Sequence, residues 1–244
     1  MEKVIEVSNL RKTYRDKVAI DNLSLDVYKG EVFGLLGPNG AGKSSTIECI
    51  LGVKSMDSGK VSLLEMEIKK DRKEIFKKVG VQFQQSSYQP KIKVWELCEV
   101  NASLYDSPKD YKKLLIDFGL DKLEKSYVSQ LSGGEFQKLS VVLALIPNPK
   151  IVFLDELTTG LDSKVRRVVW KHLIKMKEEG LTIFLTSHYM DEVEYLCDRV
   201  CILKEGKVVT LDTVENVIYN SPYDKLEDSY LWYTGEEVVN DESI

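Results

Sequence analysis

A glycine-rich segment near the N-terminus constrains the fold more than any other feature of this chain. Its nine residues, 37–45, are Gly37, Pro38, Asn39, Gly40, Ala41, Gly42, Lys43, Ser44 and Ser45. An apolar run at residues 32–36 precedes the segment, and a helical pattern at residues 44–51 follows it. Because glycines permit turns that a Cβ blocks, backbone N–H groups of such a loop can converge on an anion. The order strand, loop, helix therefore predicts a phosphate-binding loop at a helix N-terminus.

Two side chains of this loop carry the expected chemistry. Lys43 offers a mobile positive charge to the β- and γ-phosphates of a nucleotide, and the Ser44 hydroxyl can ligate Mg²⁺. The alternative is a glycine-rich turn that binds nothing. The complete match to the motif and its flanking elements favour the nucleotide site over that alternative.

The rest of the hydrophobic pattern predicts an α/β fold. Residues 23–27 alternate apolar and polar side chains, as a half-exposed strand does. Continuous apolar runs at residues 79–83, 151–154 and 182–185 predict buried strands, whereas residues 92–145 and 163–179 have mostly helical spacing. Buried strands separated by helices imply a mainly parallel sheet covered on both faces.

Composition narrows the class of protein. The chain of 244 residues has 34 basic and 39 acidic residues, and its last 34 residues include nine of the acids. The body lacks the strong single-face basic charge of a nucleic-acid binder, so no nucleic-acid partner is expected. No apolar run approaches the roughly 20 residues that cross a bilayer, and the N-terminus lacks a signal-peptide pattern. Four cysteines without metal-ligand spacing indicate reduced thiols in a cytoplasmic protein.

Two further segments carry candidate chemistry. Asp155 and Glu156 follow the apolar run at 151–154, where Asp155 suits Mg²⁺ and Glu156 suits the activation of an attacking water. A solvated strand end is the alternative, but the position of the pair after a phosphate loop favours catalysis. Ser132, Gly133 and Gly134 precede a helix that begins near residue 135. By themselves they fit an anion site and a simple N-cap equally well.

Together these motifs resemble those of the ATP-binding-cassette ATPases, the nucleotide-binding subunits of ABC transporters, from about residue 5 to residue 235. The resemblance implies a P-loop NTPase core with a mainly parallel sheet flanked by helices. It also implies an N-terminal antiparallel β-subdomain and an inserted α-helical subdomain at about residues 86–140. In these terms the chain is a single cassette at residues 1–235, followed by an acidic tail at residues 236–244.

The resemblance further assigns ATP and Mg²⁺ as cofactors and gives each motif residue a role. Residues 132–134 match the signature sequence that contacts the nucleotide of a second copy, and residues 160–162 match the D-loop. Of the remaining residues, Tyr14 is assigned to adenine stacking and His188 to contact with the γ-phosphate. Ser44 and Asp155 are assigned to metal binding, and Gln84 to contact with Mg²⁺ and water. Lys43 and Glu156 are assigned to catalysis. Gln85 is adjacent to Gln84, which leaves the register of that motif open.

Three positions depart from the usual family pattern: Glu135, Lys138 and Leu157. Leu157 stands where a proline commonly follows the catalytic glutamate. None of the three departures removes an expected phosphate, metal or water contact, so a working ATPase is predicted.

The resemblance also implies partners. The expected partners are a membrane-spanning permease and a second cassette, either a copy of this chain or a paralogue, arranged head to tail. Residues 226–235 and 186–192 resemble segments of bacterial drug, antibiotic or peptide exporters. Export is therefore favoured, at the inner face of the cell membrane, while an importer subunit and a soluble ABC ATPase acting on ribosomes or DNA remain as alternatives.

Overall fold

The computed structural model describes residues 1–83, 88–89 and 91–236. The chain divides into two compact units, a first unit of residues 1–70 and 186–244 and a second unit of residues 71–185. The chain leaves the first unit once and returns to it after the second. The glycine-rich loop therefore belongs to the first unit, and the Asp-Glu pair belongs to the second.

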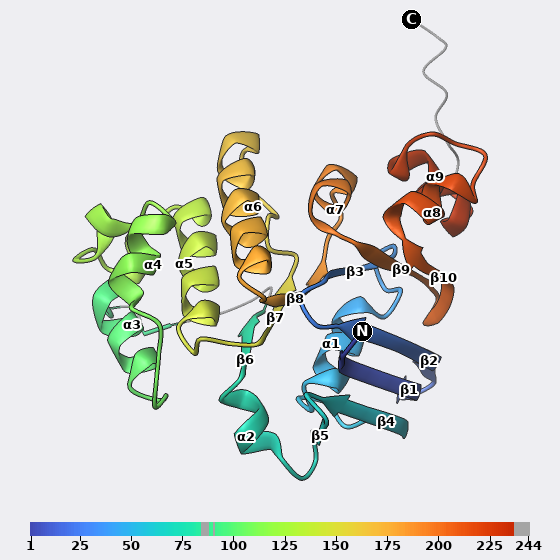
Figure 1. The fold of residues 1–244 in the computed structure, drawn as a ribbon, viewed down its shortest axis with the longest axis horizontal. Coiled ribbons are helices and arrows are strands. Elements are labelled where there is room, and N and C mark those ends of the chain that lie inside the picture. The colour runs from blue at the N-terminus through green and yellow to red at the C-terminus, as the bar shows by residue number, and fades with distance from the viewer. Residues whose placement is uncertain (84–87, 90, 237–244) are drawn as a thin grey trace, which may run out of the picture. The chain divides into compact units, whose positions relative to one another are not determined.

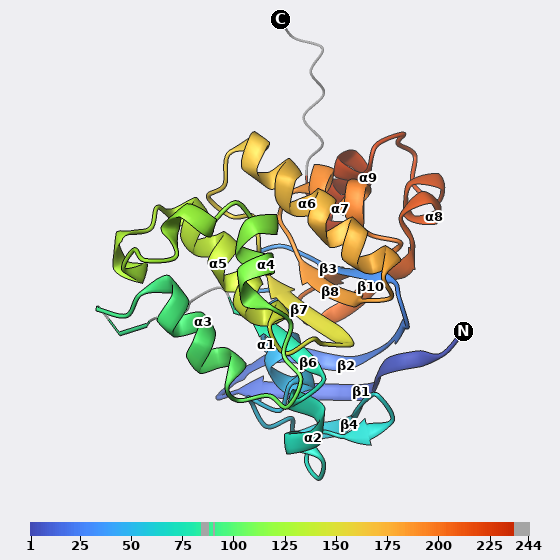
Figure 2. The ribbon, with the colours of Figure 1, turned by 60° about the vertical axis from the view of Figure 1, so that its left-hand side comes forward.

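The N-terminal part of the first unit is an antiparallel sheet with the strand order β2-β1-β4-β5 (Figure 1 and Figure 2). The strands are β1 (Lys3–Tyr14), β2 (Lys17–Tyr28), β4 (Ser58–Leu63) and β5 (Met66–Glu67). In β2, the side chains of Leu23, Leu25 and Val27 are buried while Ser24 between them is exposed. The alternation predicted for residues 23–27 is therefore confirmed, and it gives the sheet one buried face.

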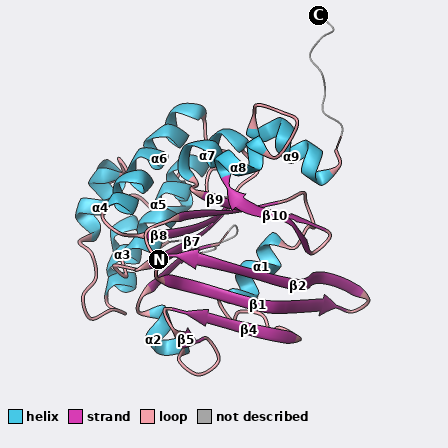
Figure 3. Ribbon diagram, turned by 45° about the vertical axis from the view of Figure 1, so that its right-hand side comes forward, coloured by secondary structure: helices cyan, strands magenta, loops and turns pink. Residues whose placement is uncertain are grey.

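The remaining strands of the first unit have the order β10-β9-β3, with β3 parallel to β9 and β9 antiparallel to β10. Their bounds are β3 (Val32–Leu36), β9 (Arg199–Lys204) and β10 (Lys207–Thr213). The helices of this unit are α1 (Lys43–Ile50), α7 (Met190–Leu196), α8 (Val214–Tyr219) and α9 (Leu226–Thr234). Figure 3 shows α8 and α9 beside the end of β10. Every residue of β3 is buried, as its continuous apolar run predicts.

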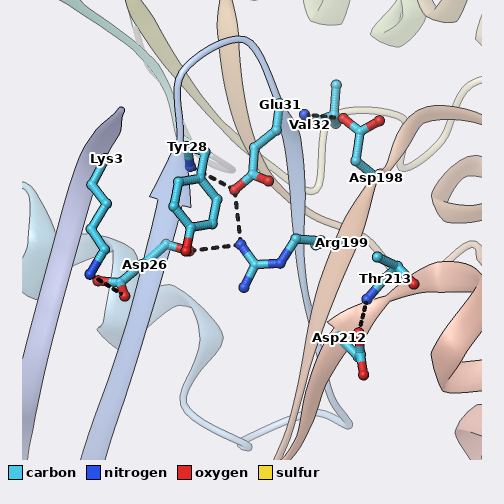
Figure 4. Close-up of polar contacts among 9 residues, drawn as sticks. All are labelled: Lys3, Asp26, Tyr28, Glu31, Val32, Asp198, Arg199, Asp212 and Thr213. Atoms are coloured by element: carbon cyan, nitrogen blue, oxygen red, sulfur yellow. Dashed lines mark hydrogen bonds and ion pairs between the residues drawn. The ribbon is translucent and has the colours of Figure 1, made fainter. Parts of the chain in front are cut away.

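The start of β3 is fixed by charged residues that are distant in the sequence (Figure 4). A Glu31 carboxylate oxygen accepts the backbone N–H of Tyr28 at 2.7 Å and pairs with Arg199 of β9 at 3.2 Å. Burial raises the pKa of Glu31, opposed by that hydrogen bond and by the charge of Arg199. The Asp198 carboxylate accepts the backbone N–H of Val32 at 2.8 Å. These contacts join the start of β3 to the start of β9.

The second unit contains strands in the order β8-β7-β6, of which β6 and β7 are parallel. Their bounds are β6 (Val79–Gln82), β7 (Ile151–Asp155) and β8 (Thr182–Thr186), the last residue of β8 belonging to the first unit. The helices are α2 (Arg72–Phe76), α3 (Val94–Ala102), α4 (Tyr111–Asp117), α5 (Gly133–Leu145) and α6 (Ser163–Glu178), with 3₁₀ turns at Asp121–Leu123 and Val128–Gln130. Figure 2 shows α3, α4 and α5 grouped together, as the helical pattern of residues 92–145 predicts.

All four cysteines are free and buried. Burial raises the pKa of the Cys98 and Cys201 thiols to about 12, and it also raises the pKa of Cys49. These three thiols are therefore held in the neutral form that suits apolar packing, in agreement with the prediction of reduced thiols.

Candidate nucleotide site

The glycine-rich loop forms the predicted connection between β3 and α1, and its glycines are required by close packing. A Cβ at Gly37 would lie 2.4 Å from the carbonyl oxygen of Leu203, and one at Gly42 would lie 2.4 Å from that of Ala19. Gly37 and Gly42 also have φ angles of 152° and 108°, in the region that favours glycine. Neighbouring strands thus leave no room for larger residues, and the loop backbone is fixed in its turn.

Lys43 is held inside this loop at the first position of α1. Its side chain is buried, and Nζ donates hydrogen bonds to the carbonyl oxygens of Gly37 at 2.6 Å and Pro38 at 3.3 Å. Ser44, the next residue, is exposed. The loop therefore combines the Lys43 ammonium, the exposed Ser44 hydroxyl and the N–H groups at the start of α1. These groups fit a nucleoside triphosphate and its metal.

Tyr14 ends β1 and keeps 38% of its surface exposed. The Lys12 ammonium lies 5.0 Å from the centroid of its ring. An aromatic ring that is partly open to solvent can stack on a purine base, as the resemblance implies.

The acid pair lies where β7 ends, and its two members have different environments. Asp155 is 5% exposed, and its carbonyl oxygen accepts a hydrogen bond from Gln82 Nε2 at 3.4 Å. Glu156 is half-buried and has a φ angle of 52°. Left-handed backbone at a residue with a side chain costs about 1–3 kcal/mol and is common at functional sites. Strand alternation alone did not predict this turn.

Ser132 is the N-cap of α5, so the N-cap interpretation of this segment is confirmed. Ser132 Oγ accepts the backbone N–H of Glu135 at 3.3 Å, and Glu135 Oε2 accepts the backbone N–H of Ser132 at 2.8 Å. This reciprocal pair is a capping box, and the hydrogen bond from the Ser132 backbone lowers the pKa of Glu135. Gly133 is exposed beside the cap. The anion-binding role of residues 132–134 stays a prediction.

His188 is exposed and follows the buried end of β8. Its neighbours Ser187 and Tyr189 are joined by a hydrogen bond, in which Ser187 Oγ accepts the backbone N–H of Tyr189 at 3.0 Å. Ser187 Oγ also donates to the carboxylate of the buried Glu192 at 2.5 Å. Sequence reasoning missed Glu192, because nothing in its local pattern marks an acid as buried. His172, the other histidine of the chain, lies on α6, and its ring centroid is 5.0 Å from that of Phe118.

The candidate residues fall into two groups. The first unit carries Tyr14, the glycine-rich loop and His188, whereas the second carries residues 132–134 and the Asp-Glu pair. Residues 160–162 also belong to the second unit, where Asp162 caps α6 by accepting the N–H groups of Lys164 and Val165 at 2.9 Å. Gln84 and Gln85 lie outside the described residues.

Comparisons with known proteins show which family and fold this chain resembles. The sequence profile of the ABC transporter family matches residues 20–159. A Nod factor export ATP-binding protein I of Rhizobium etli is 38% identical over 210 residues, which span 84% of this chain but 66% of that protein. A solved ATP-binding subunit of an ABC transporter has a TM-score of 0.87 at 24% identity, over 95% of this chain and 99% of its own. A dimeric bacterial ABC transporter cassette has a TM-score of 0.75 at 26% identity, over 86% and 98%.

These likenesses confirm the predicted P-loop fold with its mainly parallel sheet, flanking helices and N-terminal antiparallel sheet. Within the described residues, no helix has the length and apolar character needed to cross a membrane. The family profile covers more than half of the chain, including the glycine-rich loop, the signature segment and the acid pair. The chain therefore belongs to the ABC transporter family and is one of its ATP-binding, ATP-hydrolysing subunits.

Proposed function

We propose that this ATPase powers the export of a solute through a separate membrane permease, to which it binds at the cytoplasmic face of the membrane. The match to an export ATP-binding protein over 84% of this chain is the observation that carries the proposal. The resemblance of residues 226–235 to the ends of drug, antibiotic and peptide exporter subunits supports the same direction. An importer subunit or a soluble ATPase acting on ribosomes or DNA are the alternatives.

Inside-out membrane vesicles that contain the subunit with its co-purified permease distinguish these functions. An exporter accumulates a labelled drug or peptide inside such vesicles when ATP is added, and vanadate abolishes the accumulation. ATP-driven loss of a preloaded solute would instead identify an importer. The subunit can also be purified from detergent-solubilised cells together with its partners. If it brings down ribosomes or DNA and no multi-spanning protein, both transport functions are contradicted.

We propose the following division of chemistry among the residues of the two units. The loop N–H groups and Lys43 hold the β- and γ-phosphates, and Tyr14 stacks on the adenine. Ser44, Gln84 and Asp155 would hold Mg²⁺ through their oxygen atoms, and the metal would supply positive charge beside the phosphate oxygens. Glu156 orients and deprotonates the attacking water.

His188 contacts the γ-phosphate in this proposal. His188 is exposed, and its neighbours Ser187 and Tyr189 are joined by a hydrogen bond. This supports the assignment, because a backbone that is already fixed loses less conformational entropy when the side chain contacts a ligand. The working boundaries proposed for the chain are a cassette at residues 1–235, with a helical subdomain at about 86–140 and an acidic tail at 236–244.

One chain provides only part of each proposed ATP site. Residues 132–134 are proposed to contact the γ-phosphate bound by a second cassette, in a head-to-tail pair that ATP holds together. Gly133 is exposed, and a Cβ there would meet no atom within 4 Å, which leaves this segment open to a partner. The second cassette is a copy of this chain or a paralogue.

We expect Ser132→Arg to prevent ATP-driven dimerisation while leaving the affinity of the monomer for ATP within about twofold of wild type. The long cationic side chain would occupy the space at the start of α5 that a second nucleotide needs. Size-exclusion chromatography with ATP in a Glu156→Gln background measures the dimer, and calorimetry measures the affinity. If the affinity of the monomer for ATP falls together with dimerisation, Ser132 contacts the nucleotide bound by its own chain.

A groove in the second unit is the proposed permease contact. It combines apolar and basic side chains in a volume of about 550 Å³, lined by Arg72, Lys73, Phe76, Lys77, Leu104 and Tyr105. Leu104 follows the end of α3 and is 72% exposed, although it lies within residues 92–145, whose spacing is mostly helical. The Arg72 guanidinium lies 5.2 Å from the Phe76 ring centroid. Phe76, Leu104 and Tyr105 give this groove apolar surface. Arg72, Lys73 and Lys77 give it positive charge, although Lys77 also pairs with Glu74 at 3.0 Å. This combination suits an amphipathic cytoplasmic segment that carries acidic residues.

We expect Leu104→Asp to reduce permease co-purification at least tenfold without changing the ATPase rate of the isolated subunit. The new carboxylate would remove an exposed apolar anchor and oppose the acidic partner segment. Ile116→Asp on α4 is the matched control, because Ile116 is similarly exposed but does not line the groove. Equal loss in both variants would show that this groove is not the contact.

A further inference from the structure

The segment after β7 has an unusual backbone. Glu156 and Gly160 have φ angles of 52° and 79°, and two successive turns connect them. In these turns the N–H of Thr159 donates to the Glu156 carbonyl oxygen at 3.3 Å, and the N–H of Leu161 donates to that of Thr158 at 3.1 Å. A glutamate disfavours left-handed backbone, so the surroundings must hold it in this conformation.

Helix α5 lies against both ends of this segment. Gln137 Nε2 donates a hydrogen bond to the Glu156 carbonyl oxygen at 3.4 Å. At the other end, a Cβ added to Gly134 would lie 3.3 Å from a methyl group of Leu161. Gly134 and Gln137 are three residues apart and therefore share one face of α5. The first turns of the helix thus run along the segment that carries Glu156.

Packing anchors the middle of the same segment. Leu157 is 2% exposed and Thr158 is fully buried. Leu157 stands where the family commonly has a proline, which would limit the backbone by its ring. Here a buried apolar side chain takes that restraining place. The Glu156 carbonyl oxygen accepts hydrogen bonds from the N–H of Thr159 within the turn and from Gln137 of α5.

We propose that Gln137 is a positioning residue for hydrolysis. Its amide holds the carbonyl of Glu156 and so stabilises the left-handed backbone from which the catalytic carboxylate projects. The inference rests on the proposed role of Glu156 as the base. Gln137 has no contact with the nucleotide in this scheme, so its loss is expected to lower the rate of the chemical step and to leave ATP binding unchanged.

The test replaces the amide without changing the length of the side chain. We expect Gln137→Met to lower kcat about three- to tenfold with KM for ATP unchanged, the range expected when one hydrogen bond is lost. Gln137→Glu should lower kcat further, because its carboxylate cannot donate and repels the Glu156 carbonyl. Gln130→Met, which removes an exposed amide beside Tyr127, is the matched control and should retain the wild-type rate. A kcat within twofold of wild type for both Gln137 variants overturns the inference.

A double-mutant cycle separates positioning from a general loss of structure. In a Glu156→Gln background, Gln137→Met should leave the residual single-turnover rate unchanged, because the group that it positions is already absent. A further three- to tenfold loss in that background would show that Gln137 acts on another part of the protein, and would overturn the inference. Failure of the proposed function looks different, since Glu156→Gln would then itself retain near-normal turnover.

Discussion

Replacing Glu156 by glutamine should slow ATP hydrolysis about a hundred- to ten-thousandfold, the usual contribution of a positioned general base. The amide keeps the size of the side chain and can still orient a water, but it cannot accept the proton. We therefore expect ATP affinity to stay within about twofold of wild type. We also expect the variant to accumulate as a stable ATP-bound dimer, because in the proposed cycle hydrolysis is the step that releases the pair.

Single-turnover hydrolysis and calorimetry measure the two effects separately. Glu178→Gln is the matched control, because Glu178 ends α6, is exposed and has no place in the proposed site. Near-normal turnover by the Glu156→Gln variant would reject Glu156 as the base. Loss of ATP affinity without a dimer would instead assign the residue to nucleotide binding.

Replacing Gly80 by alanine should destabilise the second unit by about 3 kcal/mol, at the upper end of the usual cost of overpacking. Gly80 lies in β6, and a Cβ there would lie 1.9 Å from the carbonyl oxygen of Ala144 in α5. Pro149 Cγ would lie 3.3 Å away on the other side. Because the nearest atom belongs to a helix backbone, the clash can be relieved only by moving α5 from the strand.

Urea unfolding monitored by circular dichroism gives the free-energy change. Gly133→Ala is the control for stability, because a Cβ at Gly133 would meet no atom within 4 Å. A Gly80→Ala variant as stable as wild type would show that α5 does not pack on β6 this closely. The same variant should also disturb the proposed catalytic base, since α5 carries Gln137.

Local patterns in the sequence predicted most of the secondary structure. The five buried residues of β3, the alternation in β2 and the apolar run of β7 each follow from the periodicity of their own side chains. The capping box at Ser132 also needs only two residues three positions apart. These features involve neighbours in the chain, so one segment contains all the information that they need.

The sequence alone determined the glycine-rich loop, the strands and helices around it, and the family, because each is written in residues that are contiguous or in a fixed order. Only the tertiary structure explains why Gly37 and Gly80 have no room for a side chain. The carbonyl group that blocks Gly37 belongs to Leu203 and the one that blocks Gly80 belongs to Ala144, both far along the chain. The tertiary structure also decided the left-handed turn at Glu156 and its contact with Gln137. Such contacts depend on which backbone atoms folding brings within a few ångströms, and no local pattern of residue types records that distance.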